Sequence, residues 1–319
     1  MRILITGGAG FVGSHLCEKY VKEGHTVICY DNFMSGFLSN IKQLMNYKNF
    51  KLIQADIRDK DKLNSAIDNV DIVFHLAAQI HVDRSEIEPE LTWDINVMGT
   101  QNVLELARFH DAKRVLFASS SEVYGTAQYT PMDEKHPLDA PHPYGASKIA
   151  ADRLCHSYQK TFGMDIVIMR CFNIFGARQR DIGYGAVISI FARRCLMGLQ
   201  PVIYGKGMQR REYNYIDDIV NAYDLAFKYE KQITEPVNFG TGKDVSIDEL
   251  AKKIIRLCGK KFLPIYTNPR IAEVERLCAD ATRAKEILGW KPKVDLEEGL
   301  TKFIDWYKIY GIDREKSEI

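Results

Sequence analysis

The chain begins with a short apolar run that breaks into glycines and then continues as a helical pattern. Residues 2–6 (RILIT) predict a strand, and residues 13–24 (GSHLCEKYVKEG) predict a helix that ends at Gly24. Residues 26–31 (TVICYD) predict a second strand. A strand, a helix and a strand in this order predict a parallel β-α-β unit. This opening favours the α/β class of folds.

The same alternation of strands and helices continues to about residue 173. Further strands are predicted at 50–56, 71–78, 114–120 and 165–173, and helices at 60–69, 92–110 and 146–162. The strands are nearly all apolar, as expected when helices cover both faces of a sheet. We therefore predict a doubly wound parallel sheet of the Rossmann type.

After residue 173 the pattern changes to clustered arginines, several glycines and shorter elements. A helix is predicted near 186–197, another at 216–230 and a strand at 236–242. Ser246 stands three residues before Glu249, which predicts a capped helix. We predict a smaller, mixed α/β substrate domain made of residues 173–213 and 244–319. Residues 1–172 and 214–243 would then form the larger domain.

Length, charge and cysteine usage restrict the class of protein. The chain has 319 residues with 46% hydrophobic content, enough for a large core. A net charge of +1 predicts neither a nucleic-acid nor a membrane partner. The seven cysteines are dispersed without a CxxC pair, which indicates reduced thiols. The sequence shows no signal peptide and no apolar run of about 18 residues. We expect a cytoplasmic protein.

Three glycines between the first predicted strand and helix, Gly7, Gly10 and Gly13, are spaced G-x-x-G-x-x-G. Glycine lets the backbone approach a pyrophosphate closely, and the amides of a helix N-terminus bind that anion. Asp31 closes the second strand near the interval of about 20 residues typical of dinucleotide-binding units. A carboxylate there accepts the ribose 2′-hydroxyl and repels a 2′-phosphate, which favours NAD over NADP. A tight turn followed by an ordinary loop acid is the alternative interpretation.

Tyr144 and Lys148 lie four residues apart in the stretch PHPYGASKIAADRL. This spacing places both side chains on one face of a helix. An ammonium beside a phenol favours the phenolate and lowers the pKa of the phenol. The pair predicts a base that works near neutral pH, although an exposed surface pair would have the same spacing.

The chain resembles the extended short-chain dehydrogenase/reductase superfamily, in its nucleotide-sugar branch. The resemblance covers essentially the whole chain through GGAGFVGSHL, DNF, HLAA, HVDRS, NVMGT, SSSEVYG, YGASK, RCFNIFG and EYNYIDDIV. It implies an enzyme that uses NAD. The cofactor-binding residues implied are Gly7, Gly10, Phe11, Val12, Gly13, Asp31, Asn32, Asp56, Ile57, Leu76, Ala77, Ala78, Asn96, Tyr144 and Lys148.

The resemblance also implies the catalytic residues. Ser120 would hydrogen-bond the sugar hydroxyl that is oxidised, Tyr144 would take its proton, and Lys148 would hold the nicotinamide ribose. Ser119 and Ser121 are alternatives to Ser120, since the choice rests on alignment to the following VYG. A buried tyrosine with a purely structural role is the alternative interpretation of Tyr144.

Glu122 bears on the choice among reactions. In the family that the chain resembles, 4-epimerases have a small or neutral residue at this position. The 4,6-dehydratases have a glutamate there, which removes the proton at carbon 5 of a 4-keto sugar. The preceding Ser121 is typical of GDP-mannose dehydratases and departs from the aspartate of dTDP-glucose dehydratases. DNFMSGFLSNI and RCFNIFG resemble epimerases and UDP-glucuronate decarboxylases instead.

We therefore predict a nucleotide-sugar 4,6-dehydratase as the main interpretation. A 4-epimerase of the UDP-glucose or UDP-uronate type is the alternative, followed by a UDP-glucuronate decarboxylase. A structural role for Glu122 and a non-catalytic NAD-binding sensor remain open, although sensors of this fold typically lose the Tyr or the Lys.

The substrate and the partner follow from the same resemblance. Arginine binds a diphosphate bidentately, so several arginines are expected at a nucleotide-sugar site. The substrate-binding residues implied are Ser120, Asn173, Arg178, Arg211, Arg270 and Arg276. The helices predicted at 92–110 and 146–162 match those through which family members form a four-helix bundle. We expect a homodimer.

Overall fold

The computed structural model describes residues 1–181, 185–270 and 273–314. The chain divides into two compact units, and each is assembled from separate segments. The first unit comprises Met1–Val123, His142–Arg170 and Ala222–Val237, and the second comprises Tyr124–Pro141, Cys171–Asn221 and Asn238–Ile319.

The bounds of these units differ from the predicted domains mainly at residues 124–141, which were predicted in the larger domain and lie in the second unit. Backbone hydrogen bonds explain the difference. The amide of Ala127 donates to the carbonyl of Arg276 at 3.1 Å, and that of Met132 donates to Cys278 at 2.8 Å. Residues 214–221 and 238–243 also belong to the second unit.

A seven-stranded sheet has the order β11-β6-β5-β4-β1-β2-β3. Its strands are β1 (Arg2–Thr6), β2 (Thr26–Asp31), β3 (Phe50–Gln54), β4 (Ile72–His75), β5 (Arg114–Ser120), β6 (Ile166–Cys171) and β11 (Val237–Phe239). The pairs β1–β2, β1–β4, β2–β3 and β4–β5 run parallel. The predicted doubly wound sheet is confirmed, and the strand order reverses beside β1.

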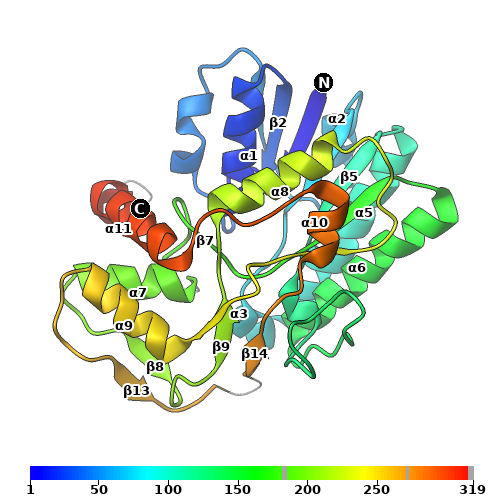
Figure 1. Cartoon of the computed structure of the whole chain (residues 1–319). Coiled ribbons are helices and arrows are strands. Elements are labelled where there is room, and N and C mark those ends of the chain that lie inside the picture. Colours follow the sequence, from blue (N-terminus) through cyan, green and yellow to red (C-terminus); the bar gives the residue numbers. More distant parts are fainter. Residues whose placement is uncertain (182–184, 271–272, 315–319) are drawn as a thin grey trace. The chain divides into compact units, whose positions relative to one another are not determined.

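Helices connect the strands of this sheet (Figure 1). They are α1 (Phe11–Lys22), α2 (Lys60–Ile67), α3 (Val82–Ile87), α4 (Pro89–Trp93), α5 (Gly99–Phe109), α6 (Pro143–Phe162) and α8 (Ile216–Lys228). Short turns lie at η1 (Leu38–Asn40), η2 (Lys42–Leu44) and η4 (Ser121–Val123). The helix predicted at 92–110 is interrupted, because residues 94–98 form a π-helical segment, η3 (Asp94–Met98), between α4 and α5.

Both faces of the sheet are covered, since successive strand residues point to opposite sides. On one face, Phe74 of β4 packs against Tyr20 of α1 and Phe227 of α8, with ring centroids 5.1 Å and 6.0 Å away. On the other face, Val73 of β4 belongs to a buried cluster that includes Val103 of α5 and Ala151 of α6. The apolar strands therefore form the centre of the first unit.

The second unit contains three small sheets, in the orders β10-β7, β12-β9-β14 and β13-β8. Their strands are β7 (Ile174–Phe175), β8 (Val202–Tyr204), β9 (Arg210–Glu212), β10 (Asn214–Tyr215), β12 (Asp244–Ser246), β13 (Ile265–Thr267) and β14 (Arg276–Leu277). Its helices are α7 (Val187–Leu196), α9 (Ile247–Leu257), α10 (Thr282–Leu288) and α11 (Leu296–Arg314). The predicted cap of α9 is confirmed, because Ser246 and Glu249 form a reciprocal capping box.

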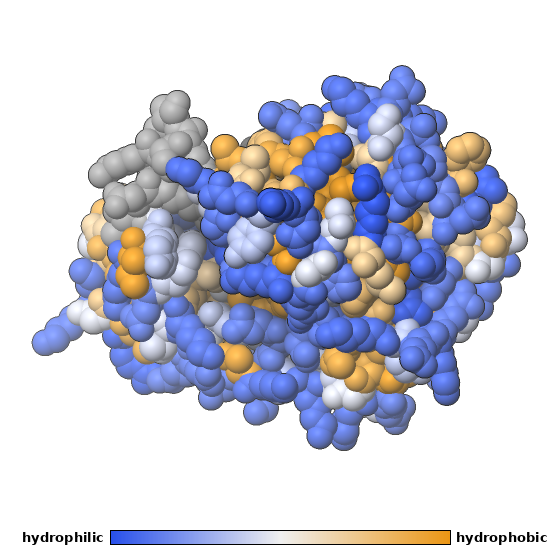
Figure 2. All heavy atoms as spheres, turned by 90° about the horizontal axis from the view of Figure 1, so that it is seen from above, coloured by the Kyte–Doolittle hydropathy of each residue, from blue (hydrophilic) through white to orange (hydrophobic). Residues whose placement is uncertain are grey.

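Hydrophilic residues predominate on the face drawn in Figure 2, with hydrophobic residues scattered among them. Among the described residues, no helix combines the length and the apolar character that crossing a bilayer requires.

Candidate active site

The glycine loop between β1 and α1 is held by its own backbone. Gly7 has a φ of 70°, and its amide donates to the carbonyl of Tyr30 at 2.8 Å. A Cβ on Gly13 would lie 2.1 Å from the Gly7 carbonyl oxygen, and a Cβ on Gly7 would lie 2.8 Å from the Ala77 nitrogen. The loop therefore has no room for side chains at these positions.

This loop leads into the N-terminus of α1, whose N-cap is Gly10. The amides of the first turn, from Phe11, Val12 and Gly13, have no intrahelical acceptor by the geometry of a helix. Such amides, with the positive end of the helix dipole, bind a phosphate. The closely packed glycines and these amides form a backbone cradle that fits a dinucleotide pyrophosphate.

Asp31 lies at the end of β2 and fixes the glycine loop. Its Oδ2 accepts from the Ala9 amide at 2.9 Å, and its Oδ1 accepts from the Phe33 amide at 2.7 Å. Burial raises the pKa of Asp31, while the amide hydrogen bonds act in the opposite direction. The carboxylate thus connects the end of β2 with the loop after β1, which is where the sequence predicts a ribose contact.

Asn32 and Asp56 are joined after neighbouring strands. The side-chain Nδ2 of Asn32 donates to Asp56 Oδ2 at 2.8 Å. The Arg58 guanidinium donates to both carboxylate oxygens of Asp56, at 2.9 Å and 2.8 Å. The Arg58 side chain lowers the pKa of Asp56 to about 2. Ile57 is buried, and a Cβ on Gly99 would lie 2.4 Å from its Cδ1. These residues lie at the carboxyl ends of β2 and β3, as an adenine site requires.

Residues 76–78 follow β4 and run beside β1. The Leu76 amide donates to the Thr6 carbonyl at 3.1 Å, and the Ala77 amide lies 3.3 Å from Thr6 Oγ1. Leu76, Ala77 and Ala78 are half-buried. The predicted cofactor residues of β1, β2, β3 and β4 therefore gather at one edge of the sheet.

Asn96 is buried in the π-helical segment, and its side chain forms hydrogen bonds with other residues of the chain. Its Oδ1 accepts from the Gln79 amide at 2.8 Å, and its Nδ2 donates to the Gln79 carbonyl and to Ser147 Oγ, both at 2.9 Å. Asn96 thus joins the loop after β4 to α6. Isolated π-helical turns are frequent at functional sites.

Ser120 and Tyr144 are brought together by β5 and α6. The phenol of Tyr144 shares a hydrogen bond with the Ser120 side chain, and Tyr144 is only 8% exposed. The Tyr144 amide donates to Ser85 Oγ at 3.0 Å. Ser85 was not predicted as a site residue, although it belongs to the motif HVDRS. The predicted serine and tyrosine contact each other, which supports Ser120 over its two neighbours.

In the protein alone, the pKa of Tyr144 lies above its usual value, whereas the sequence predicts that Lys148 and the oxidised nicotinamide together lower it. Burial, the largest cause, and the charge of Glu122 raise the pKa of Tyr144 to about 12, and the hydrogen bond with Ser120 opposes them only in part. The ammonium of Lys148 donates to the Ala118 carbonyl of β5 at 2.5 Å and lies 4.6 Å from the centroid of the Phe117 ring. Helical spacing places two residues on one face, but it does not determine burial.

Glu122 lies on the turn after β5, beside the residues of α6. Its amide lies 3.1 Å from Ser120 Oγ, and its Oε2 lies 3.1 Å from Nε2 of His142. His142 was not predicted as a site residue. The available signal was its place immediately before Pro143, where a helix N-cap is expected.

Two predicted arginines of the second unit are paired with acids. Arg211 Nη2 lies 3.1 Å from Glu273, and Arg276 Nε lies 2.5 Å from Asp244. Arg270 lies over the ring of Tyr204, at 4.5 Å from its centroid.

The other two predicted substrate residues follow β6 in the second unit. Arg178 has a φ of 70°. The Nδ2 of Asn173 is buried and makes no hydrogen bond within the described part of the chain. A buried donor without a partner is costly, so this atom fits a contact with a bound substrate.

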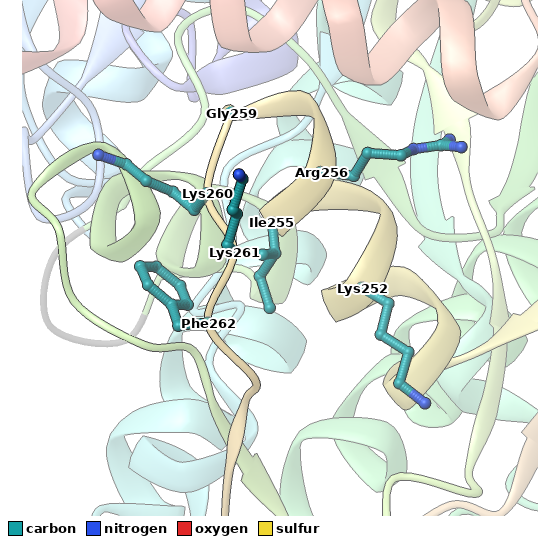
Figure 3. Close-up of a pocket in the computed structure, with 7 residues that line it drawn as sticks. All are labelled: Lys252, Ile255, Arg256, Gly259, Lys260, Lys261 and Phe262. Atoms are coloured by element: carbon teal, nitrogen blue, oxygen red, sulfur yellow. The ribbon is translucent and has the colours of Figure 1, made fainter.

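A pocket of about 400 Å³ lies at the C-terminal end of α9 (Figure 3). Lys252 and Arg256, which line it, pair with Asp248 at 2.7 Å and Glu297 at 3.0 Å. Its remaining lining residues are Ile255, Gly259, Lys260, Lys261 and Phe262. None of them is a predicted site residue, so this pocket is separate from the candidate active site.

Comparisons with known proteins identify the family of this chain. The family model described as GDP-mannose 4,6 dehydratase matches residues 4–303. A protein of Methanocaldococcus jannaschii named "Putative UDP-glucose 4-epimerase" is 41% identical over 96% of this chain and 98% of its own.

Two solved structures show the same fold. The UDP-glucose 4-epimerase of Thermotoga maritima, solved with UDP-glucose, superposes with a TM-score of 0.92 at 34% identity, over 97% of this chain and 99% of its own. The dTDP-glucose 4,6-dehydratase of Streptomyces venezuelae, solved with NAD, gives 0.92 at 30% identity, over 97% and 98%. The chain therefore belongs to the extended short-chain dehydrogenase/reductase family, in its branch of nucleotide-sugar epimerases and dehydratases.

Proposed function

We propose that the protein binds NAD and transiently oxidises carbon 4 of a nucleotide-diphosphate sugar. The contact between Ser120 and the buried phenol of Tyr144 carries this proposal. Family membership and the NAD-bound neighbour support it. When bound, NAD supplies a hydride acceptor that later returns the hydride to the sugar.

The residues of the first unit fit NAD. The cradle of Gly7, Gly10 and Gly13 takes the pyrophosphate, and Asp31 and Asp56 are suited to the ribose and adenine ends. We assign Asn32, Ile57, Leu76, Ala77, Ala78 and Asn96 to the same site. The carboxylate of Asp31 favours NAD over NADP by repelling a 2′-phosphate.

Tyr144 takes the proton of the sugar 4-hydroxyl, which Ser120 orients by a hydrogen bond. With a pKa of about 12, the phenol is protonated at neutral pH in the protein alone. A positive charge must therefore offset burial before Tyr144 can accept a proton. Lys148 is the fixed cation on the same helix, and the oxidised nicotinamide ring carries a second positive charge.

The relatives favour 4-epimerisation as the overall reaction. A 4-keto sugar is planar at carbon 4, so hydride return to the opposite face inverts that carbon. The M. jannaschii relative and the T. maritima structure are both named as UDP-glucose 4-epimerases. We therefore place this reaction, the alternative in the sequence prediction, ahead of dehydration.

Glu122 favours 4,6-dehydration as a second candidate. Its carboxylate is close enough to Tyr144 to raise the pKa of that phenol, and it approaches His142 at 3.1 Å. A ketone at carbon 4 acidifies the proton at carbon 5, so a carboxylate is an adequate base. Loss of the carbon-6 hydroxyl as water would follow.

The second unit would bind the diphosphate. We assign this role to Arg211 and Arg270, with Arg178, Arg276 and Asn173 as further contacts. Guanidinium groups and an unpartnered buried amide are suited to phosphate and sugar oxygens. The charge of a diphosphate would compete with Glu273 and Asp244 for the two paired arginines.

A homodimer through a four-helix bundle remains part of the proposal. Large apolar side chains on or beside the predicted dimer helices are exposed: Trp93 (46%), Met98 (45%), Phe109 (74%) and Phe162 (48%). Their burial against a second copy would remove apolar surface from water.

A nucleotide-sugar panel in deuterated water tests the proposed function. The purified protein with NAD is given UDP-, GDP- and dTDP-hexoses, and products are separated and weighed. Epimerisation predicts an unchanged carbon skeleton and mass with altered retention. Dehydration predicts loss of water with solvent deuterium at carbon 5. Tight NAD binding without conversion of any sugar would instead indicate a sensor.

A further inference from the structure

Both ring nitrogens of His142 have partners in the first unit. Nδ1 accepts a hydrogen bond from the Gly145 amide at 3.0 Å and thereby caps α6. Nε2 lies 3.1 Å from Oε2 of Glu122, and the His142 side chain is 2% exposed. Because an amide nitrogen can only donate, Nδ1 carries a lone pair. The proton of the neutral ring is therefore on Nε2, which donates to Glu122.

The same contact fixes the position of Glu122 relative to Tyr144. The rings of His142 and Tyr144 are nearly parallel, 13° apart in plane with centroids 6.0 Å apart. The Glu122 amide lies 3.1 Å from Ser120 Oγ, so its backbone is tied to the residue that contacts the Tyr144 phenol. Glu122 is thus restrained at its backbone and at its carboxylate, and its side chain is 16% exposed.

We propose that His142 is a positioning residue that holds the Glu122 carboxylate beside Ser120 and Tyr144 as the second proton acceptor of the site. This inference rests on the second candidate of the proposed function, in which oxidation at carbon 4 is followed by loss of the carbon-5 proton. Once carbon 4 is a ketone, the carbon 5–hydrogen bond breaks, its proton goes to a Glu122 oxygen, and its electron pair forms the enolate. Reprotonation from solvent introduces deuterium at carbon 5 in deuterated water.

A pair of His142 variants separates positioning from helix capping. His142→Ser keeps a good N-cap and removes the donor to Glu122, whereas His142→Ala removes both. The nucleotide sugar that the wild type converts is incubated in deuterated water, and deuterium at carbon 5 is compared with turnover at carbon 4.

We expect exchange at carbon 5 to fall about 10- to 100-fold in both variants, because displacing a base by about 1 Å has effects of this size. KM should stay within about twofold. Only His142→Ala should lose appreciable thermal stability. Near-wild-type exchange in His142→Ser, with loss only in His142→Ala, would mean that His142 merely caps the helix and would overturn the proposal.

Glu122→Gln tests the role of the carboxylate that accepts the hydrogen bond from His142. Its amide oxygen still accepts from His142 Nε2 but cannot take a proton. We expect no exchange at carbon 5 in this variant and no further loss when His142→Ser is added. Conversion at carbon 4 without exchange in the wild type would overturn the role of Glu122 while leaving the proposed function intact.

Nitrogen-15 NMR of the folded protein tests His142 without turnover. We expect the proton on Nε2, and its signal should shift in Glu122→Ala. A proton on Nδ1 would contradict the geometry, whereas failure of every nucleotide sugar to react would remove only the proposed function.

Discussion

The predicted site residues of the two units differ in how they are held. In the first unit, Ser120 and Tyr144 share a hydrogen bond, and the glycine loop is packed against its neighbours. In the second unit, Arg211 and Arg276 are paired with Glu273 and Asp244. The catalytic residues of the first unit thus contact each other, whereas these two arginines of the second unit contact acidic side chains.

This difference follows from what the two groups must do. Proton transfer requires reacting groups in fixed positions, because small displacements cost much rate. A cation that grips a diphosphate needs only to be available, and an internal acid can satisfy it before the ligand binds. Changes in the first group should therefore lower kcat, and changes in the second should raise KM.

The largest effect is expected for Tyr144→Phe. Removal of the proton-accepting phenol should lower kcat about 10²- to 10⁴-fold, with KM nearly unchanged. Steady-state kinetics measures both constants. Tyr124→Phe is the control, since that buried phenol donates to Asn238 at 2.7 Å in the second unit and should affect stability rather than kcat. Full activity of Tyr144→Phe would contradict the catalytic assignment.

Gly13→Ala tests whether the glycine loop is as rigid as its packing indicates. The new Cβ would lie 2.1 Å from the Gly7 carbonyl oxygen, so the loop must shift. We expect NAD affinity to fall at least about tenfold, since overpacking costs about 1–3 kcal/mol. Calorimetry measures the affinity. Gly163→Ala, whose Cβ meets no atom within 4 Å, should lose stability but keep NAD binding.

Arg211→Met and Glu273→Gln test the ion pair of Arg211, and they should change KM in opposite directions. Loss of the guanidinium should raise KM about tenfold or more, because a hydrogen bond to a charged group contributes about 1.5–3 kcal/mol. Glu273→Gln should lower KM, since it releases Arg211 from its ion pair at 3.1 Å. A kcat effect with unchanged KM in both variants would remove the distinction between the two units.

A smaller effect concerns the pH stability of the first unit. Burial lowers the pKa of His75 from 6.5 to about 3, and the ring lies between Thr6 at 2.8 Å and Thr100 at 3.0 Å. The unfolded chain gains this proton first as pH falls. The free energy of unfolding should therefore fall between pH 6.5 and about 3.

Denaturant unfolding at several pH values measures this contribution. His75→Gln keeps groups that can bond both threonines but does not titrate. We expect the variant to have a slope flatter by up to about 1.4 kcal/mol per pH unit within that window. An identical slope in the variant would show that His75 is not the responsible group.

The sequence predicts those features of the site that depend on local backbone geometry. It does not predict those that depend on burial and on tertiary neighbours. The spacing of Gly7, Gly10 and Gly13 predicts a packed loop, and a Cβ at Gly7 or Gly13 would indeed lie within 2.8 Å of a backbone atom. The pKa of Tyr144 depends on burial and on Glu122, which come from tertiary neighbours. His142 escaped prediction for the same reason, since its partner lies 20 residues earlier in the chain.

The fold shows the same division. The bounds of β1, β2 and β5 agree with the sequence prediction, because buried parallel strands are continuous apolar runs. The π-helical segment at Asp94–Met98 was not predicted, since the hydrogen bonds of Asn96 to Gln79 and Ser147 are long-range contacts. Residues 124–141 follow the first unit in sequence but bond to β14 and its neighbours.

The central claim is that Ser120 and Tyr144 support oxidation and re-reduction within one bound sugar. The most direct measurement uses a nucleotide sugar carrying deuterium at carbon 4. The account predicts that the wild type retains this deuterium in the product, at carbon 4 after epimerisation or at carbon 6 after dehydration, and that Tyr144→Phe is almost inactive. Release of the deuterium into water, or equal turnover by the variant, would contradict it.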